Sequence, residues 1–196
     1  MEQFLNDHNF STNNINYPSR KYRIPTLAKE VRQNIIEYSV RQNPQKLHFV
    51  THSMGGIILR QIQKTNPLPN LGRAIMLGPP NRGSEVVDKL DHLSLFHFLN
   101  GPAASQLGTN PESIPNQLGH VTFELGVIAG DRSINPMLSL MIPGKDDGKV
   151  SVLNTKIDGM KDFLLVNCPH PFLMNNRRAR KATLEFLKTG KFPSFE

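Results

Sequence analysis

Short apolar runs alternate with stretches of helical periodicity along almost the whole chain, and this alternation limits its fold more than any other feature. Residues 47–50 form a compact apolar run bounded by polar residues, which is typical of a strand buried on both faces. Helical patterns flank this run at residues 26–40, with Thr26 as the expected N-cap, and at residues 56–64. This order of elements predicts an α/β domain with a mostly parallel sheet, flanking helices and right-handed crossovers.

The rest of the chain continues the same pattern. A short strand is predicted at residues 15–17, ended by Pro18, which cannot donate a ladder hydrogen bond. Other expected elements are a short helix in residues 1–10, strands at 73–77, 123–129 and 163–166, and helices at 84–90 and 175–187. Residues 91–119 are predicted to be an irregular insertion. Active groups are expected at the carboxyl ends of the strands.

Length and composition favour one globular domain over residues 1–196, with 38% hydrophobic and 20% charged residues. The formal net charge of +7 predicts attraction to anionic surfaces or ligands. The single cysteine, Cys168, excludes an internal disulfide and a C-x-x-C zinc pattern. No apolar run approaches the roughly 18 residues that span a bilayer, so the chain as given is expected to be soluble and, by default, cytoplasmic.

Residues 51–56, Thr-His-Ser-Met-Gly-Gly, lie between a predicted strand and a predicted helix. This is the context of a nucleophile elbow, in which a tight turn exposes the hydroxyl of Ser53 and a glycine at position 55 keeps the turn open. The N–H of Met54 is then placed to stabilise an oxyanion at the helix N-terminus. The alternative is that Ser53 only caps the helix.

A base and an acid follow Ser53 in the chain order expected of a Ser-Asp-His triad. His170 comes directly after the last predicted strand, where a loop can turn its imidazole toward Ser53. The acid is expected from the pair Asp146 and Asp147, of which one should face solvent because two buried anions repel each other. Asp131, at the end of its own predicted strand, is a third candidate for the acid. The alternative for His170 is that it is an ordinary loop histidine without a catalytic role.

Several motifs together resemble the α/β-hydrolase superfamily, in particular its lipase-like esterases. They are the elbow at 51–56 and the segments Tyr-Pro-Ser-Arg at 17–20, Leu-Gly-Pro-Pro-Asn-Arg-Gly-Ser at 77–84, Asp-Gly-Lys-Val at 147–150 and Pro-His at 169–170. The resemblance implies that Asp147, the aspartate followed by glycine, is the triad acid. It also implies a serine ester hydrolase that needs no cofactor; an acyltransferase with the same acyl-enzyme is not distinguished from it.

Two departures from the family pattern stand out. Thr51 replaces the first glycine of the usual elbow, and no His-Gly pair occurs in the chain. The family's strand that ends in a His-Gly loop and lies beside the nucleophile strand is therefore expected to be missing, so the domain is expected to be shortened at its N-terminus. Loss of one oxyanion donor typically costs on the order of 10²- to 10³-fold in rate. A catalytically impaired domain with a binding or structural role is thus the alternative function, and any signal peptide would be hidden by the same shortening.

Residues 134–142 are an apolar segment before the acid loop, broken by proline and serine. Met137, Leu138 and Leu140 are its candidate substrate-binding residues, as acyl-pocket lining or lid, although plain packing explains them equally well. The substrate expected is a small-molecule or lipid ester. The basic run 177–181 favours peripheral contact with an anionic membrane, and without interleaved aromatic residues it argues against nucleic acid. No metal site and no oligomeric state are predicted.

Overall fold

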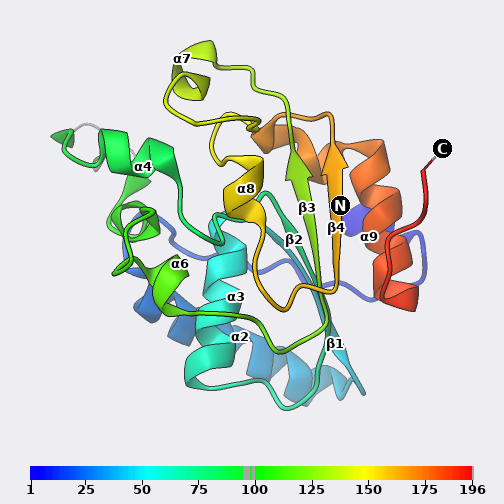
Figure 1. Ribbon diagram of the computed structural model, residues 1–196. Helices are drawn as coiled ribbons and strands as arrows, with labels where there is room; N and C mark the ends of the chain where they lie inside the picture. The colour runs from blue at the N-terminus through cyan, green and yellow to red at the C-terminus, as the bar shows by residue number, and fades with distance from the viewer. Residues whose placement is uncertain (95–97, 99, 196) are drawn as a thin grey trace.

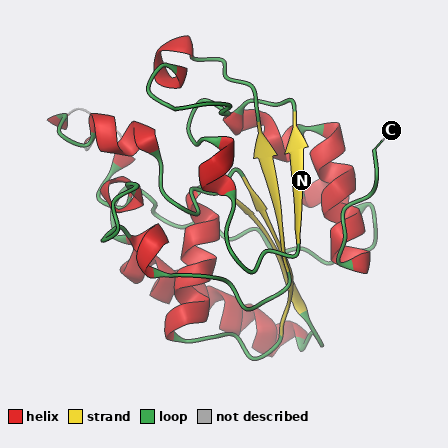
Figure 2. Ribbon diagram, viewed as in Figure 1, coloured by secondary structure: helices red, strands yellow, loops and turns green. Residues whose placement is uncertain are grey.

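The computed structural model describes residues 1–94, 98 and 100–195. Within these residues one sheet has four strands in the order β1 (Leu47–His52), β2 (Leu71–Leu77), β3 (Leu125–Gly130) and β4 (Asp162–Val166). All neighbouring strands are parallel, so their carboxyl ends lie at one edge of the sheet, marked by the arrowheads in Figures 1 and 2. The predicted α/β class with a parallel sheet is confirmed.

Helices cover both faces of the sheet (Figure 2). On one face α2 (Ile24–Gln42) packs against α3 (Met54–Thr65), and their apolar stripes, which include Leu27 and Ile58, form one core cluster. On the other face α1 (Glu2–Asn6) and α9 (Arg177–Thr189) pack over strand residues, with Phe186 fully buried. The sheet is therefore the middle layer of three.

Short helices make up most of the connections. Along the chain they are α4 (Glu85–Leu90), η1 (Ala104–Leu107), α6 (Ile114–Gln117), α7 (Pro136–Ser139), α8 (Val152–Thr155) and η2 (His170–Asn175). The first helix after β2 is α4, and the first after β3 is α7, so these elements begin at the carboxyl edge of the sheet. In the part of the chain that the structure describes, no helix has both the length and the apolarity to cross a bilayer.

Two local predictions are wrong. Residues 15–17 form no strand, because Ile15 and Tyr17 turn their side chains into the cluster under α2 and α3 instead of pairing with β1. The N-cap of α2 is Arg23 rather than Thr26. Pro25 explains this second difference, since its fixed φ suits the first helical turn and moves the helix start ahead of Thr26.

The outer edge of β1 is open. The N–H groups of Leu47 and Ser53 donate to Asn70 and Leu77 on the β2 side, at 2.9 Å each, so alternate residues of β1 face β2. The backbone N–H and C=O groups of the residues in between, His48, Val50 and His52, therefore point away from the sheet. No described residue makes a backbone hydrogen bond with these groups. The chain between α1 and α2 passes this edge, with the Phe10 ring edge-on to His48 at 6.3 Å between centroids.

Candidate active site

Ser53 lies at the junction of β1 and α3 with φ 52° and ψ −127°. A non-glycine residue with positive φ is strained by about 1–3 kcal/mol, and such strain is found where surrounding contacts enforce it. Here the Ser53 N–H donates to Leu77 O at 2.9 Å. The Ser53 side chain makes no capping hydrogen bond, so the reading of this serine as a helix cap lacks its characteristic contact.

Close packing behind the turn explains why glycine follows the serine. A Cβ on Gly56 would lie 2.9 Å from Met76 Sδ, whereas one on Gly55 would lie at an ordinary 3.5 Å from Thr51 Cβ. The tight position is therefore Gly56, one residue later than the expected one. Thr51 is accommodated because its hydroxyl turns to the Ile75 carbonyl at 3.3 Å.

Asp147 and His170 form a buried pair. His170 Nδ1 lies 2.7 Å from Asp147 Oδ2, and the two residues are 7% and 1% exposed. The other carboxylate oxygen accepts the N–H groups of Lys149 and Val150, at 3.0 Å each. The His170 N–H also donates to the Asp147 carbonyl at 2.9 Å. Because these hydrogen bonds hold the Asp147 carboxylate in one orientation, it points at the His170 imidazole before any substrate binds.

The other two aspartates lie elsewhere. Asp146 accepts hydrogen bonds from Gly148 N at 2.7 Å and from Ser139 Oγ at 2.8 Å. Asp131 accepts from Asn167 Nδ2 at 3.2 Å and lies 3.8 Å from Lys145 Nζ. Neither hydrogen-bonds to His170. Asp146 is buried as well, so the expectation that one of the adjacent aspartates faces solvent is wrong; backbone and hydroxyl donors stabilise both carboxylates.

The elbow and the buried pair meet at the carboxyl edge of the sheet. Leu77, which holds the Ser53 N–H, precedes Gly78, and a Cβ there would lie 3.0 Å from both Asp147 Oδ2 and His170 Nδ1. Next to Ser53, His52 Nε2 lies 3.0 Å from the His170 carbonyl, with the two rings 4.6 Å apart. The structure shows no hydrogen bond between Ser53 Oγ and His170 Nε2. Such bonds are often formed only in the substrate complex.

His52 is electrostatically unusual. Burial, reinforced by the neighbouring His170, lowers the pKa of its imidazole from 6.5 to about 4. His52 is therefore neutral at physiological pH and contributes a hydrogen bond rather than a charge. No role for His52 was predicted from the sequence, although its place beside the candidate nucleophile was a signal. Burial raises the pKa of the Cys168 thiol, in keeping with a packing role for this residue.

Met54 is the first residue of α3, so its N–H belongs to the helix turn that has no intrahelical acceptor. The helix N-terminus also carries partial positive charge, which favours an oxyanion there. Tyr17 lies close by, since a Cβ on Gly55 would lie 3.6 Å from its hydroxyl oxygen. Burial raises the pKa of Tyr17, so its hydroxyl keeps its proton. No local pattern in the sequence predicts the position of Tyr17 at the elbow.

The candidate substrate-binding residues lie on and beside α7. Met137 and Leu140 are exposed, and Leu138 is half-buried. Leu140 helps to line a surface hollow of about 420 Å³ shared with α4, and neither Ser53 nor His170 is among its lining residues. Contact between these three side chains and a substrate remains a prediction.

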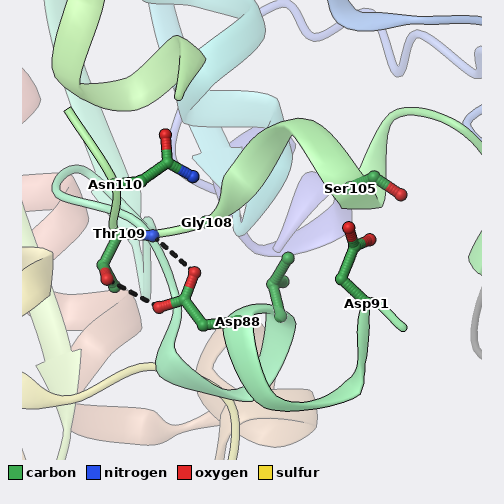
Figure 3. A pocket seen from close by; sticks show the side chains of 7 residues that line it. Asp88, Asp91, Ser105, Gly108, Thr109 and Asn110 are labelled. Carbon is green, nitrogen blue, oxygen red and sulfur yellow. Dashed lines mark hydrogen bonds between the residues drawn. The ribbon is translucent and has the colours of Figure 1, made fainter. Parts of the chain in front are cut away.

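A second hollow, of about 370 Å³, lies between α4 and the segment after η1 (Figure 3). Asp88 spans it, accepting hydrogen bonds from Thr109 N at 2.9 Å and Thr109 Oγ1 at 2.6 Å. Its carboxylate thus connects α4 to the insertion. Across residues 1–94, 98 and 100–195, no group of three or more His, Cys, Asp or Glu side chains is arranged to hold a metal ion.

Comparison with known proteins finds no matching family model and no matching curated protein. Solved structures do match. The mature lipase BlEst2 of Bacillus licheniformis has a TM-score of 0.56 and 18% identity, over 79% of this chain and 69% of that one. Phospholipase PlaB from Legionella pneumophila matches with a TM-score of 0.61 and 18% identity, over 79% of this chain and 41% of the phospholipase. A metagenomic carboxyl esterase matches with a TM-score of 0.69 and 14% identity, over 88% of this chain and 58% of the esterase.

These similarities, together with the parallel sheet and the strained serine between β1 and α3, show that the chain has the α/β-hydrolase fold. The predicted resemblance to this superfamily is confirmed at the level of fold. The chain spans less than two thirds of the phospholipase and of the carboxyl esterase.

Proposed function

We propose that this chain is a serine hydrolase that cleaves an ester with an apolar acyl group through an acyl-enzyme. Ser53 is the nucleophile, His170 the general base and then the general acid, and Asp147 the residue that orients the imidazole. The N–H of Met54 binds the oxyanion. A lipase, a phospholipase and a carboxyl esterase among the matching structures support the choice of an ester bond.

In the first half-reaction the Ser53 hydroxyl oxygen attacks the ester carbonyl while His170 Nε2 takes its proton. The tetrahedral intermediate collapses, the C–O bond to the leaving alcohol breaks, and His170 returns the proton to that alcohol. In the second half-reaction water attacks the acyl carbon while His170 takes a proton from it. The acyl–serine bond then breaks, His170 returns the proton to Ser53 Oγ, and the acid leaves. The Asp147 carboxylate keeps the Nδ1 proton on the imidazole and stabilises its cationic form.

The observation that carries the proposal is the combination of a strained Ser53 with a buried Asp147–His170 pair at the same edge of the sheet. Either feature alone has a structural explanation. Their connection through Leu77 and Gly78, which hold the elbow on one side and contact the pair on the other, favours a single reactive unit.

A fluorophosphonate probe tests the proposal directly, because it labels serines that a neighbouring base activates. Wild type should be labelled and should hydrolyse p-nitrophenyl esters, while Ser53→Ala should do neither. Ser133→Ala removes a hydroxyl from the same edge and should leave both signals unchanged. Labelling of Ser53→Ala at the wild-type level would contradict the assignment.

The alternative is an impaired hydrolase-like domain with a binding or structural role. Two observations favour it: Ser53 Oγ makes no hydrogen bond to His170, and no described strand pairs with the outer edge of β1 beside the elbow. The same probe distinguishes the two functions. A folded wild type that takes up no label would select the alternative.

A further inference from the structure

The hydroxyl of Tyr17 lies beside the elbow and has no part in the reaction as proposed so far. Its ring packs against the core cluster under α2 and α3, as the side chain of Met54 does. The hydroxyl oxygen lies 3.6 Å from the position of a Cβ on Gly55, the second residue of α3. Because the Cα–Cβ bonds of a helix tilt toward its N-terminus, the hydroxyl lies beside the first turn of α3.

This hydroxyl has no partner in the folded chain. No residue that the structure describes forms a hydrogen bond with it. The oxygen is not sealed from solvent, so water or a substrate atom can reach it. Burial raises the pKa of Tyr17, so the hydroxyl carries its proton at neutral pH and can act as a donor.

The hydroxyl is on the flank of the elbow that faces away from β2. A Cβ on Gly56 would contact Met76 of β2, whereas one on Gly55 would contact Thr51 of β1 and the Tyr17 hydroxyl. Tyr17 also belongs to the segment between α1 and α2, which passes the outer edge of β1. In α/β hydrolases the second oxyanion donor comes from a loop beside the nucleophile strand. No described strand occupies that side of β1, and the Tyr17 hydroxyl lies there instead.

We propose that the Tyr17 hydroxyl is the second oxyanion donor of this site, together with the N–H of Met54. This inference rests on the proposed function, because it assigns a role in the same acyl transfer. When Ser53 Oγ adds to the ester carbonyl, the carbonyl electron pair moves onto oxygen, and both groups donate hydrogen bonds to that oxygen without transferring a proton. The packed ring holds the donor in place, and no internal hydrogen bond has to break when the substrate binds.

A role in packing alone explains the ring but not the hydroxyl. A tyrosine hydroxyl that is partly buried usually finds a partner within the protein. Tyr38, also half-buried, follows this rule, with its hydroxyl oxygen 3.4 Å from Ser11 Oγ. The free hydroxyl of Tyr17 is what a donor to a bound ligand requires.

Tyr17→Phe tests the assignment, because it removes the hydroxyl and keeps the ring. For a p-nitrophenyl ester, kcat and kcat/KM should fall together by about 10²-fold, since an oxyanion donor acts in the transition state. The midpoint of urea denaturation should not fall, because the hydroxyl has no partner to lose. Tyr38→Phe removes a hydroxyl from a half-buried tyrosine of α2 and is the matched control, with wild-type kcat expected.

A p-nitrophenyl thionoester distinguishes a catalytic hydroxyl from a structural one. Sulfur in place of the carbonyl oxygen is a weak hydrogen-bond acceptor, so the donors of the site contribute little to its transition state. Tyr17→Phe should therefore lower kcat/KM for the thionoester by less than about tenfold, against about 10²-fold for the oxygen ester. A displacement of Ser53 or His170 would slow both substrates equally.

Three results would overturn the proposal: wild-type kcat in Tyr17→Phe, an equal loss on the two esters, or an equal loss in Tyr38→Phe. Equal hydrolysis by wild type and Tyr17→Phe, abolished by Ser53→Ala, would remove only the role of Tyr17 and leave the proposed function intact. A wild type that takes up no fluorophosphonate and cleaves neither ester would contradict both.

Discussion

Gly78 is the residue that most closely limits the geometry of the Asp147–His170 pair. It follows β2 with φ 55°, and a Cβ at this position would approach Leu173 Cδ1 at 2.8 Å and both members of the pair at 3.0 Å. The position thus needs glycine for its backbone conformation and for space. Its importance is visible only in three dimensions, because its neighbours come from segments far along the chain.

Gly78→Ala should therefore displace the imidazole and lower kcat for ester hydrolysis about 10²-fold, since a shift of about 1 Å at a catalytic group costs that much. Gly119→Ala is the matched control, with φ 69° and nothing within 4 Å of the added Cβ. Both variants should lose about 1–2 kcal/mol of stability from the left-handed backbone conformation. Gly78→Ala should lose more because its Cβ contacts Leu173, and only Gly78→Ala should lose activity. Steady-state kinetics and chemical denaturation measure the two effects. Equal activities would show that Gly78 does not position the pair.

The three candidate aspartates also differ in their contacts at the scale of residues. The family resemblance implied Asp147 as the triad acid, with Asp131 and Asp146 as alternatives. The contact at 2.7 Å between Asp147 and His170 distinguishes them geometrically. Asp147→Asn should reduce kcat by about 10⁴-fold, by loss of the correct imidazole tautomer, with Asp131→Asn close to wild type. Comparable losses in both variants would contradict the proposed role.

At the scale of elements, Arg60 connects α3 to the loops that surround the site. Its guanidinium is buried at 3% exposure and donates to four acceptors: Asn81 O, Asn81 Oδ1, Pro115 O and Gly119 O, at 2.7–3.2 Å. Burial lowers the pKa of Arg60 to about 10, so it remains a cation at neutral pH. One side chain therefore attaches the helix behind the elbow to the segment after β2 and to α6.

Arg60→Leu should destabilise the fold by about 2–4 kcal/mol, because it leaves several buried carbonyl oxygens without donors. Arg32→Leu, which removes a single hydrogen bond to Asn66 O near the surface, should cost less than about 0.5 kcal/mol. Urea denaturation followed by circular dichroism gives both values. A loss at Arg60 no larger than that at Arg32 would show that the connection contributes little.

Periodicity predicted most elements because it is a local property. The helices around residues 26–40 and 56–64 and the strand at 47–50 appear in the structure, each extended by a few residues. The predicted strand at 15–17 does not appear, because its apolar residues pack against the core cluster of α2 and α3 instead of pairing with β1. A three-residue apolar run does not indicate whether it will pair with a neighbouring strand or pack its side chains against helices.

At the scale of the whole molecule, His52 makes folding stability depend on pH. Its pKa in the folded chain is about 4, against 6.5 for an unperturbed histidine, so protonation favours unfolding. The corresponding stability is complete above pH 6.5 and falls by up to about 3 kcal/mol as the pH drops toward 4.

His52→Gln should flatten the pH dependence of the unfolding free energy between pH 6.5 and about 4. Gln retains an amide that can donate to the His170 carbonyl, so the fold should persist. His120→Gln changes an exposed histidine and should keep the wild-type slope. Denaturant titrations across this range compare the three proteins. An unchanged slope in His52→Gln would rule out His52 as its source.

The sequence by itself determined the α/β layering and the position of the elbow, because alternating periodicity and a serine–glycine turn between strand and helix depend on neighbouring residues. Tertiary structure alone decided that Asp147 meets His170, that no described strand pairs with the outer edge of β1, and that Met137 and Leu140 face outward. Those outcomes depend on which groups approach each other across long stretches of chain, and burial and pairing, unlike periodicity, are properties of the assembled layers.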